Sequence, residues 1–128
     1  MQDNTPLHRC DIKPLSMNEA FMGRKRKTAA YRTYEIKLPK QLPDLELPAK
    51  GPLGLKVRVG YSNRQRDIDN CLKPFIDILQ KQYGFNDNRL YTLEVIKVKT
   101  EKGEEYIAFD IFPLSEEPTD DNLDGLFG

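Results

Sequence analysis

Histidine and cysteine are scarce in this chain, with one His and two Cys in 128 residues. A single histidine, His8, argues against nucleases that use His-metal fingers and against Ser-His-Asp hydrolases. The two cysteines, Cys10 and Cys71, lie far apart and form no C-x-x-C pattern. That spacing argues against a zinc site and against a secreted disulfide scaffold. We therefore expect reduced thiols in a cytoplasmic protein.

Long apolar runs are missing as well. No stretch approaches the length of a membrane span, and no signal-like apolar run follows Leu7. The sequence also has no Gly-rich phosphate loop and no internal repeat. With 38% apolar and 31% charged residues, the composition is typical of a soluble globular protein. The length allows one domain with a real core, which needs no metal or disulfide to fold.

The net charge of zero hides an uneven distribution. Residues 115–128 contain five acidic and no basic side chains, so the remainder has 20 basic against 15 acidic residues, a net charge of +5. Basic side chains concentrate at Arg24-Lys25-Arg26-Lys27 and at Arg64 and Arg66. Such patches suit a phosphate backbone, and binding through them weakens with salt. A basic run alone is more often a solvated loop, so its meaning depends on what accompanies it.

Hydrophobic periodicity predicts two helices and four strands. Residues 14–27 read as a polar, basic loop, and 42–52 as a Pro- and Gly-containing connection. Lys102-Gly103 lies in a chain reversal, so the last two strands are expected to form a hairpin. The order is β-α-β-α-β-β, which predicts an α+β fold. In chain order the expected elements are strand 8–13, helix 28–38, strand 55–61, helix 68–83, strand 90–99 and strand 105–112.

The second helix is the best defined. Asp69 or Asn70 can cap its start and Gly84 suits its end, while Pro74 requires a short or irregular first turn. Opposite its apolar stripe, Asp69, Lys73 and Asp77 recur at intervals of four and are expected to stack on one face. The stripe comprises Ile68, Leu72, Phe75, Ile76, Leu79 and Tyr83.

Acidic side chains gather around this helix. Asp67 and Asp69 are two residues apart, so at the end of an extended segment both can point to one side. Asp87 follows the helix and could close the site from a neighbouring strand. Three carboxylates with water describe a Mg²⁺ site, and such a metal lowers the pKa of a bound water and offsets charge on a scissile phosphate. Lys73 would act as a fixed cation. The alternative remains open that these residues only cap the helix and form an ordinary i, i+4 ion pair.

The motifs together resemble those of the RusA-type Holliday junction resolvases. Asp67-Ile68-Asp69-Asn70 matches the family's Asp-x-Asp-Asn, followed by the expected Lys73 and Asp77-Ile78-Leu79. Asn86-Asp87 then stands where many members have two aspartates, and Asp87 aligns with the catalytic second one. Upstream, Pro14-Leu15-Ser16-Met17-Asn18 and the basic loop resemble a Pro-x-Ser-x-Asn segment. Gly84 and Lys97 also stand at positions that match the family's pattern. The likeness as a whole extends over residues 8–113.

The resemblance implies a small mixed sheet and a homodimeric, Mg²⁺-dependent endonuclease, in which Mn²⁺ could substitute for Mg²⁺. Such enzymes nick two opposed strands of a four-way DNA junction during recombination and repair, and many come from phages or prophages. Residues 1–114 would form the nuclease domain, located in the cytoplasm of a bacterium or infected host, with no membrane association. The family's catalytic and metal-binding aspartates map to Asp67, Asp69 and Asp87, and its essential lysine to Lys73. The expected DNA contacts are Asn18, Arg24, Lys25, Arg26, Lys27, Arg64, Arg66, Asn70 and Lys97.

Two other functions stay open: a nuclease with a broader preference for flaps and branched DNA, and a junction-binding protein that does not cut. The acidic tail, residues 115–128, has no counterpart in this scheme. It is interpreted as a disordered, solubilising segment. The alternatives are a docking peptide for a protein partner, or a competitor with DNA for the basic surface.

Overall fold

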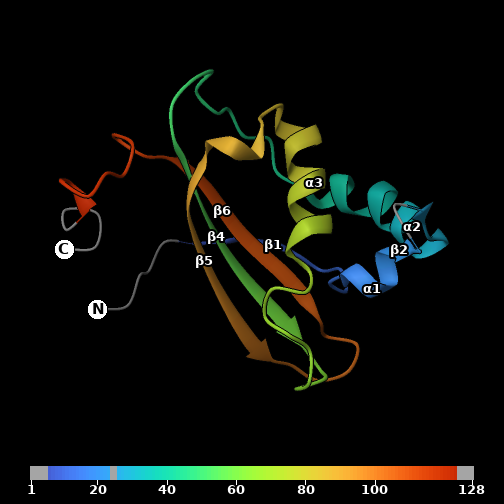
Figure 1. The fold of residues 1–128 in the computed structure, drawn as a ribbon. Helices are drawn as coiled ribbons and strands as arrows, with labels where there is room; N and C mark the ends of the chain where they lie inside the picture. Colours follow the sequence, from blue (N-terminus) through green and yellow to red (C-terminus); the bar gives the residue numbers. More distant parts are fainter. Residues whose placement is uncertain (1–5, 24–25, 124–128) are drawn as a thin grey trace.

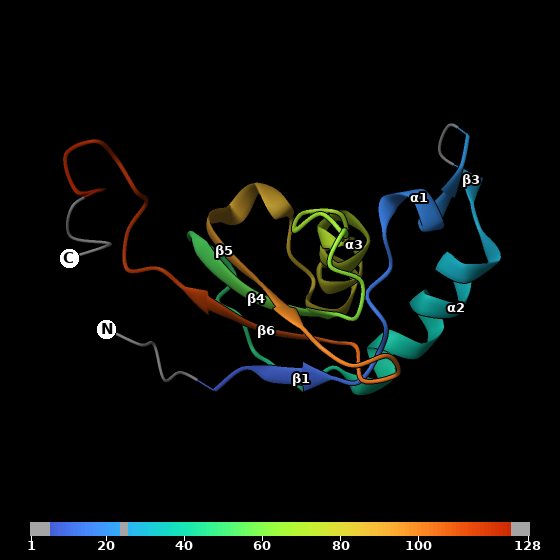
Figure 2. The ribbon, with the colours of Figure 1, turned by 90° about the horizontal axis from the view of Figure 1, so that it is seen from below.

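The computed structural model describes residues 6–23 and 26–123, and it has a mixed α+β fold. A four-stranded sheet has the strand order β1-β6-β4-β5, and helices cover one of its faces (Figures 1 and 2). The main elements follow the predicted order β-α-β-α-β-β. In the sheet these are β1 (His8–Cys10), β4 (Leu53–Tyr61), β5 (Leu90–Lys99) and β6 (Tyr106–Pro113), and the two longer helices are α2 (Ala29–Lys37) and α3 (Leu72–Tyr83).

The segment predicted as a basic loop is more structured than expected. It contains a short helix, α1 (Met17–Ala20), and a two-stranded hairpin, β2 (Phe21–Met22) and β3 (Arg26–Lys27). A capping box starts α1, because the Ser16 side chain accepts a bond from the Glu19 amide while the Glu19 carboxylate accepts from the Ser16 amide. A loop prediction based on polarity overlooked this local signal.

The predicted hairpin between the last two strands is wrong. β5 pairs with β4 in parallel, from Leu53↔Leu90 to Tyr61↔Lys99, whereas β6 pairs with the other edge of β4 in antiparallel orientation. The reversal at Lys102-Gly103 therefore passes the end of β4. β4 lies between β6 and β5, which suits its mostly buried side chains, and the α3 crossover allows its parallel pairing with β5.

α3 ends as predicted but begins later. Gly84 terminates it in the left-handed conformation, with φ 67°, which glycine adopts without strain. The N-cap is Cys71, which provides no side-chain bond, so the predicted cap by Asp69 or Asn70 is wrong. Ile68 also lies outside the helix and is 44% exposed. Pro74 is the third helical residue, where no intrahelical donor is required.

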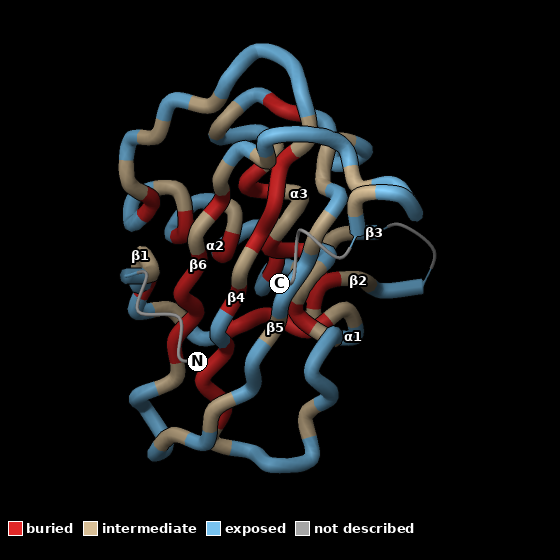
Figure 3. Tube along the Cα trace, turned by 90° about the vertical axis from the view of Figure 1, so that its left-hand side faces the viewer, coloured by how far each residue is buried: buried red, intermediate tan, exposed pale blue. Residues whose placement is uncertain are grey.

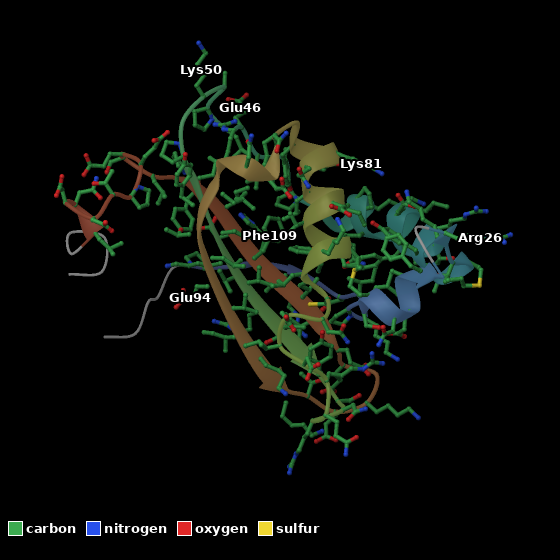
Figure 4. The ribbon with its side chains drawn as sticks, in the orientation of Figure 1. Arg26, Glu46, Lys50, Lys81, Glu94 and Phe109 are labelled. Carbon is green, nitrogen blue, oxygen red and sulfur yellow. The ribbon has the colours of Figure 1, made fainter. Side chains whose placement is uncertain are left out.

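The core lies between the sheet and the helices. Phe109 of β6 sits between the sheet and α3 (Figure 4), with ring centroids 5.5 Å from Phe75 and 6.4 Å from Tyr83. Cys10 and Cys71 are free and fully buried, and burial raises the pKa of the Cys10 thiol to about 11. Both thiols are therefore packing groups.

Within residues 6–23 and 26–123, the longer helices all lie on the other side of the sheet, and none of them covers this second face (Figure 3). Here aromatic rings of β6 lie against glycines of β4. A Cβ atom on Gly60 would come within 2.5 Å of the Tyr106 ring, and one on Gly54 within 2.6 Å of the Phe112 ring. These glycines leave room for the rings to pack flat on the sheet.

We expect Gly60→Ala to lower the free energy of unfolding by about 1–3 kcal/mol, because the added methyl group overlaps the Tyr106 ring. Chemical denaturation measures this loss. In a Tyr106→Ala background the same substitution should be less destabilising, since the obstructing ring is gone. An equal loss in both backgrounds would contradict the overlap as its cause.

No helix within residues 6–23 and 26–123 is long and apolar enough to cross a membrane.

Candidate nucleic-acid and metal site

The loop after β4 carries the two aspartates of the predicted motif. Residues 68–71 form turns before α3, and the Asn70 amide donates to the Asp67 carbonyl at 3.2 Å. Asp67 and Asp69 are both exposed. They therefore belong to a turn and not, as predicted, to the end of an extended segment. Their carboxylates still stand only two residues apart on a solvent-facing loop.

Two contacts join this loop to α1. The Arg66 guanidinium lies 3.0 Å from the Glu19 carboxylate, and the Met17 amide donates to the Asn70 carbonyl at 3.0 Å. Burial raises the pKa of Glu19, but hydrogen bonds from Ser16 and Arg66 outweigh it and lower the pKa overall. Segments almost fifty residues apart are thereby held side by side. Glu19 was not among the predicted site residues, although the spacing Ser16-x-x-Glu19 is a capping-box signature.

Lys97 fixes the same loop from β5. Its ammonium group donates to the carbonyls of Arg66 at 2.8 Å and Arg64 at 3.0 Å. Next to it, Lys99 donates to the Ser62 carbonyl at 3.0 Å. Lys97, predicted as a DNA contact, thus donates to the backbone of the loop that follows β4 and carries Asp67 and Asp69 (the acidic loop, residues 62–71). These bonds hold the acidic loop in position.

We expect Lys97→Met to loosen this loop, because two charge-assisted hydrogen bonds are lost, together on the order of 1–3 kcal/mol. Amide hydrogen exchange over residues 63–67 should become faster, while Lys102→Met, an exposed lysine in the β5–β6 reversal, should leave it unchanged. If exchange stays the same and only the salt dependence of DNA binding falls by about one charge, Lys97 is a phosphate contact instead.

Asp87 and the acidic loop lie at opposite ends of the paired strands β4 and β5. Asp87 begins a 3-10 helix, η2 (Asp87–Arg89), which leads into β5. Because β5 is parallel to β4, its start lies beside Leu53, whereas the acidic loop follows Tyr61 (Figure 1). Eight residue steps of β4 separate these ends, about 26 Å at about 3.3 Å per residue. The fold of the chain therefore does not bring Asp87 to Asp67 and Asp69.

This separation bears directly on the predicted Mg²⁺ site. Mg²⁺ holds its oxygen ligands at about 2.0–2.1 Å, so all three carboxylates would have to converge. Among the described residues no three His, Cys, Asp or Glu side chains lie close enough to hold a metal ion. Within one copy, Asp67, Asp69 and Asp87 do not fit the ion as a triad. Asp67 and Asp69 alone form an exposed pair.

A polar row along α3 connects the two ends. The Lys73 ammonium lies 3.4 Å from the Asp77 carboxylate, as the i, i+4 spacing predicts. Gln80 donates to Asp77 at 3.5 Å and accepts from the Asp87 amide at 2.8 Å. Asp69 precedes the helix and does not complete the predicted stack. Gln80, which the sequence did not single out, thus fixes the backbone at Asp87.

The other predicted DNA contacts lie on or near the α1 side. Arg26 is exposed on β3 and projects from the hairpin (Figure 4). Lys27 bonds Glu35 at 3.0 Å. Arg64 and Asn18 are exposed, while Asn70 is half-buried with its carbonyl engaged by α1. Arg24 and Lys25 lie outside the described residues.

No protein-family model matches this chain, and no curated protein matches it.

Proposed function

We propose that the protein is a metal-dependent endonuclease of the RusA type that resolves four-way DNA junctions by paired nicks. One observation carries the proposal: α1, from the Pro14–Asn18 region, lies directly against the Asp67–Asn70 loop. Two motifs that the resemblance links only by order in the chain are thereby in contact: Pro14, Leu15 and Ser16 are buried beside the loop, and Asn18 is exposed with Asp67 and Asp69. The loop bears the two exposed carboxylates and, in the residues before them, the exposed Arg64 and the Glu19-paired Arg66, and Arg26 lies on the hairpin that follows α1.

In this proposal the residues divide their roles by charge. Arg26, Arg64 and the neighbouring basic side chains bind the phosphate backbone, and Asp67 and Asp69 supply oxygen ligands for the divalent cation. When bound, that cation would activate water and offset charge on the phosphate. The tail begins at the opposite end of the sheet, where the Leu114 amide donates to the Pro52 carbonyl and Glu117 lies near Tyr91 at the start of β5 (Figure 1), and a role as a partner-docking peptide remains a prediction.

The test is cleavage of an end-labelled four-way junction beside a matched linear duplex, a flap and a fork, with Mg²⁺, with Mn²⁺ or with EDTA. We expect nicks at opposed strands of the junction only, and only with a metal. Equal cutting of flaps and forks would instead identify a nuclease for branched DNA in general. The absence of any junction selectivity would overturn the proposal.

A junction-binding protein without cleavage is a second candidate, favoured by the separation of Asp87 from Asp67 and Asp69 within one copy. It predicts tight junction binding and no nicks with either metal.

A further inference from the structure

We propose that the C-terminal segment, residues 123–127, folds back onto its own chain and occupies a hollow on the open face of the sheet, the face opposite the longer helices. Leu126 and Phe127 fill the hollow in this arrangement. The inference goes beyond the proposed function and does not depend on it. It gives the acidic tail a binding place at the end of the sheet opposite the acidic loop, so the tail does not compete there with DNA.

The hollow lies where β6 ends and β5 begins. Phe112 and Leu114 border it on one side and Thr92 and Leu93 on the other, and its volume is about 440 Å³. Ligand pockets in proteins have volumes of about 300–1,000 Å³, so the hollow has room for two apolar side chains. Lys56 also lines it, with its ammonium group 5.7 Å from the centroid of the Phe112 ring.

The tail starts at this hollow. The Leu114 amide donates to the Pro52 carbonyl at 2.9 Å, which holds the first residues after β6 against the sheet. Three residues further on, the Glu117 carboxylate raises the pKa of the Tyr91 hydroxyl through its charge and a hydrogen bond. The described part of the tail lies on the side of the sheet that faces away from the helices (Figures 1 and 3). It therefore stays beside the start of β5, next to the hollow.

A turn then sends the chain back. The Thr119 amide donates to the Asn122 side-chain oxygen at 2.7 Å, and the Asn122 amide donates to the Thr119 hydroxyl at 3.3 Å. The Asn122 side-chain amide also donates to the Glu117 carbonyl at 2.9 Å. These bonds bring residue 122 back beside residue 117. Leu123 therefore follows a turn that lies close to Tyr91, and it does not stand at the tip of an extended arm.

The rest of the chain is long enough to enter the hollow. Phe127 is four residues from Leu123, a reach of about 6 Å in a helix and about 14 Å in an extended chain. Thr92, the residue after Tyr91, already borders the hollow. Leu123, Leu126 and Phe127 have the i, i+3, i+4 spacing of one apolar helix face, a common pattern in peptides that bind grooves.

Charge and tethering favour this occupant. By strand register, the open face carries three basic side chains, Arg9, Lys56 and Arg58, against the two acidic ones of Glu94 and Asp110. The face therefore does not repel an acidic segment. A short tether keeps that segment at an effective concentration in the millimolar range. A weak contact is thus populated within one chain, whereas a separate protein would have to bind more tightly.

The docking is tested on the full chain by the reactivity of a cysteine placed in the hollow. Thr92→Cys should react with a thiol reagent at least about fivefold more slowly than the same variant that also carries Leu126→Ser and Phe127→Ser, a ratio that corresponds to a docked fraction of about four-fifths. The two native thiols are fully buried. The matched control is Lys102→Cys, exposed at the opposite end of the sheet, whose rate should not depend on the tail. Equal rates for Thr92→Cys with either tail would overturn the docking and leave the hollow to a separate partner protein.

A disulfide then distinguishes docking within one chain from docking between copies. Thr92→Cys combined with Gly128→Cys should give a covalently closed monomer under mild oxidation, which requires Cα atoms within about 7 Å. Adding Phe127→Ser should slow the closure, whereas Lys102→Cys with Gly128→Cys should not close. Covalent dimers in place of closed monomers, with a yield that rises with protein concentration, would overturn docking within one chain and assign the hollow to the tail of a second copy. Neither measurement needs nuclease activity, so a failure of the proposed function leaves both intact.

Discussion

Asp69→Asn should lower the rate of junction cleavage by about 100-fold or more while leaving junction affinity within about twofold. The substitution removes one anionic ligand, and loss of several kcal/mol of transition-state stabilisation corresponds to that factor. Asp69 is exposed, and its carbonyl, which accepts the Leu72 amide at 3.1 Å, is retained. Cleavage kinetics and a binding titration at fixed salt give the two quantities.

The matched control is Asp120→Asn, which removes another exposed carboxylate, from the tail. It changes the net charge by the same amount, so a purely electrostatic effect on DNA binding would affect both variants alike. Normal cleavage by Asp69→Asn, with intact folding by circular dichroism, would refute the assignment of this residue to the metal.

Phe109→Ala should be the most destabilising single substitution in the sheet, by about 3–5 kcal/mol. The side chain is fully buried and packs against the rings of His8, Phe75 and Tyr83. Its truncation leaves a cavity that several elements border at once. For a chain of this size the melting temperature should fall by on the order of 10–20 °C, as measured by calorimetry.

Phe112→Ala is the comparison, since it makes the same truncation on the same strand. Phe112 lies on the open face over Gly54 and is only half-buried, so we expect a loss of about 1–2 kcal/mol. Similar losses for the two variants would mean that the helix-covered face does not form the dominant core.

The sequence predicted those elements whose local signals agree with their environment. The α3 stripe and the Gly84 terminator identified this helix and its end, although not its start, and the alternation of Leu55 to Tyr61 located β4. The predicted helix 28–38 corresponds to α2, whose Tyr31 and Tyr34 are 2% and 4% exposed and therefore pack in the core. Short elements such as α1 and the β2–β3 hairpin were missed, because a few polar residues carry little periodicity.

The sequence by itself determined the composition of the site: two aspartates on one loop, a lysine and an aspartate on one helix, and basic side chains upstream. These groups of residues are close in the sequence, so their spacing alone predicts that they lie on the same loop or helix. Only the tertiary structure decided which of these groups are in contact. The parallel pairing of β4 with β5 joins residues far apart in the sequence, and it depends on the burial of β4 and on the α3 crossover. That pairing carries Asp87 to the end of the sheet opposite Asp67 and Asp69, places Arg66 against Glu19, and turns Lys97 toward the loop backbone.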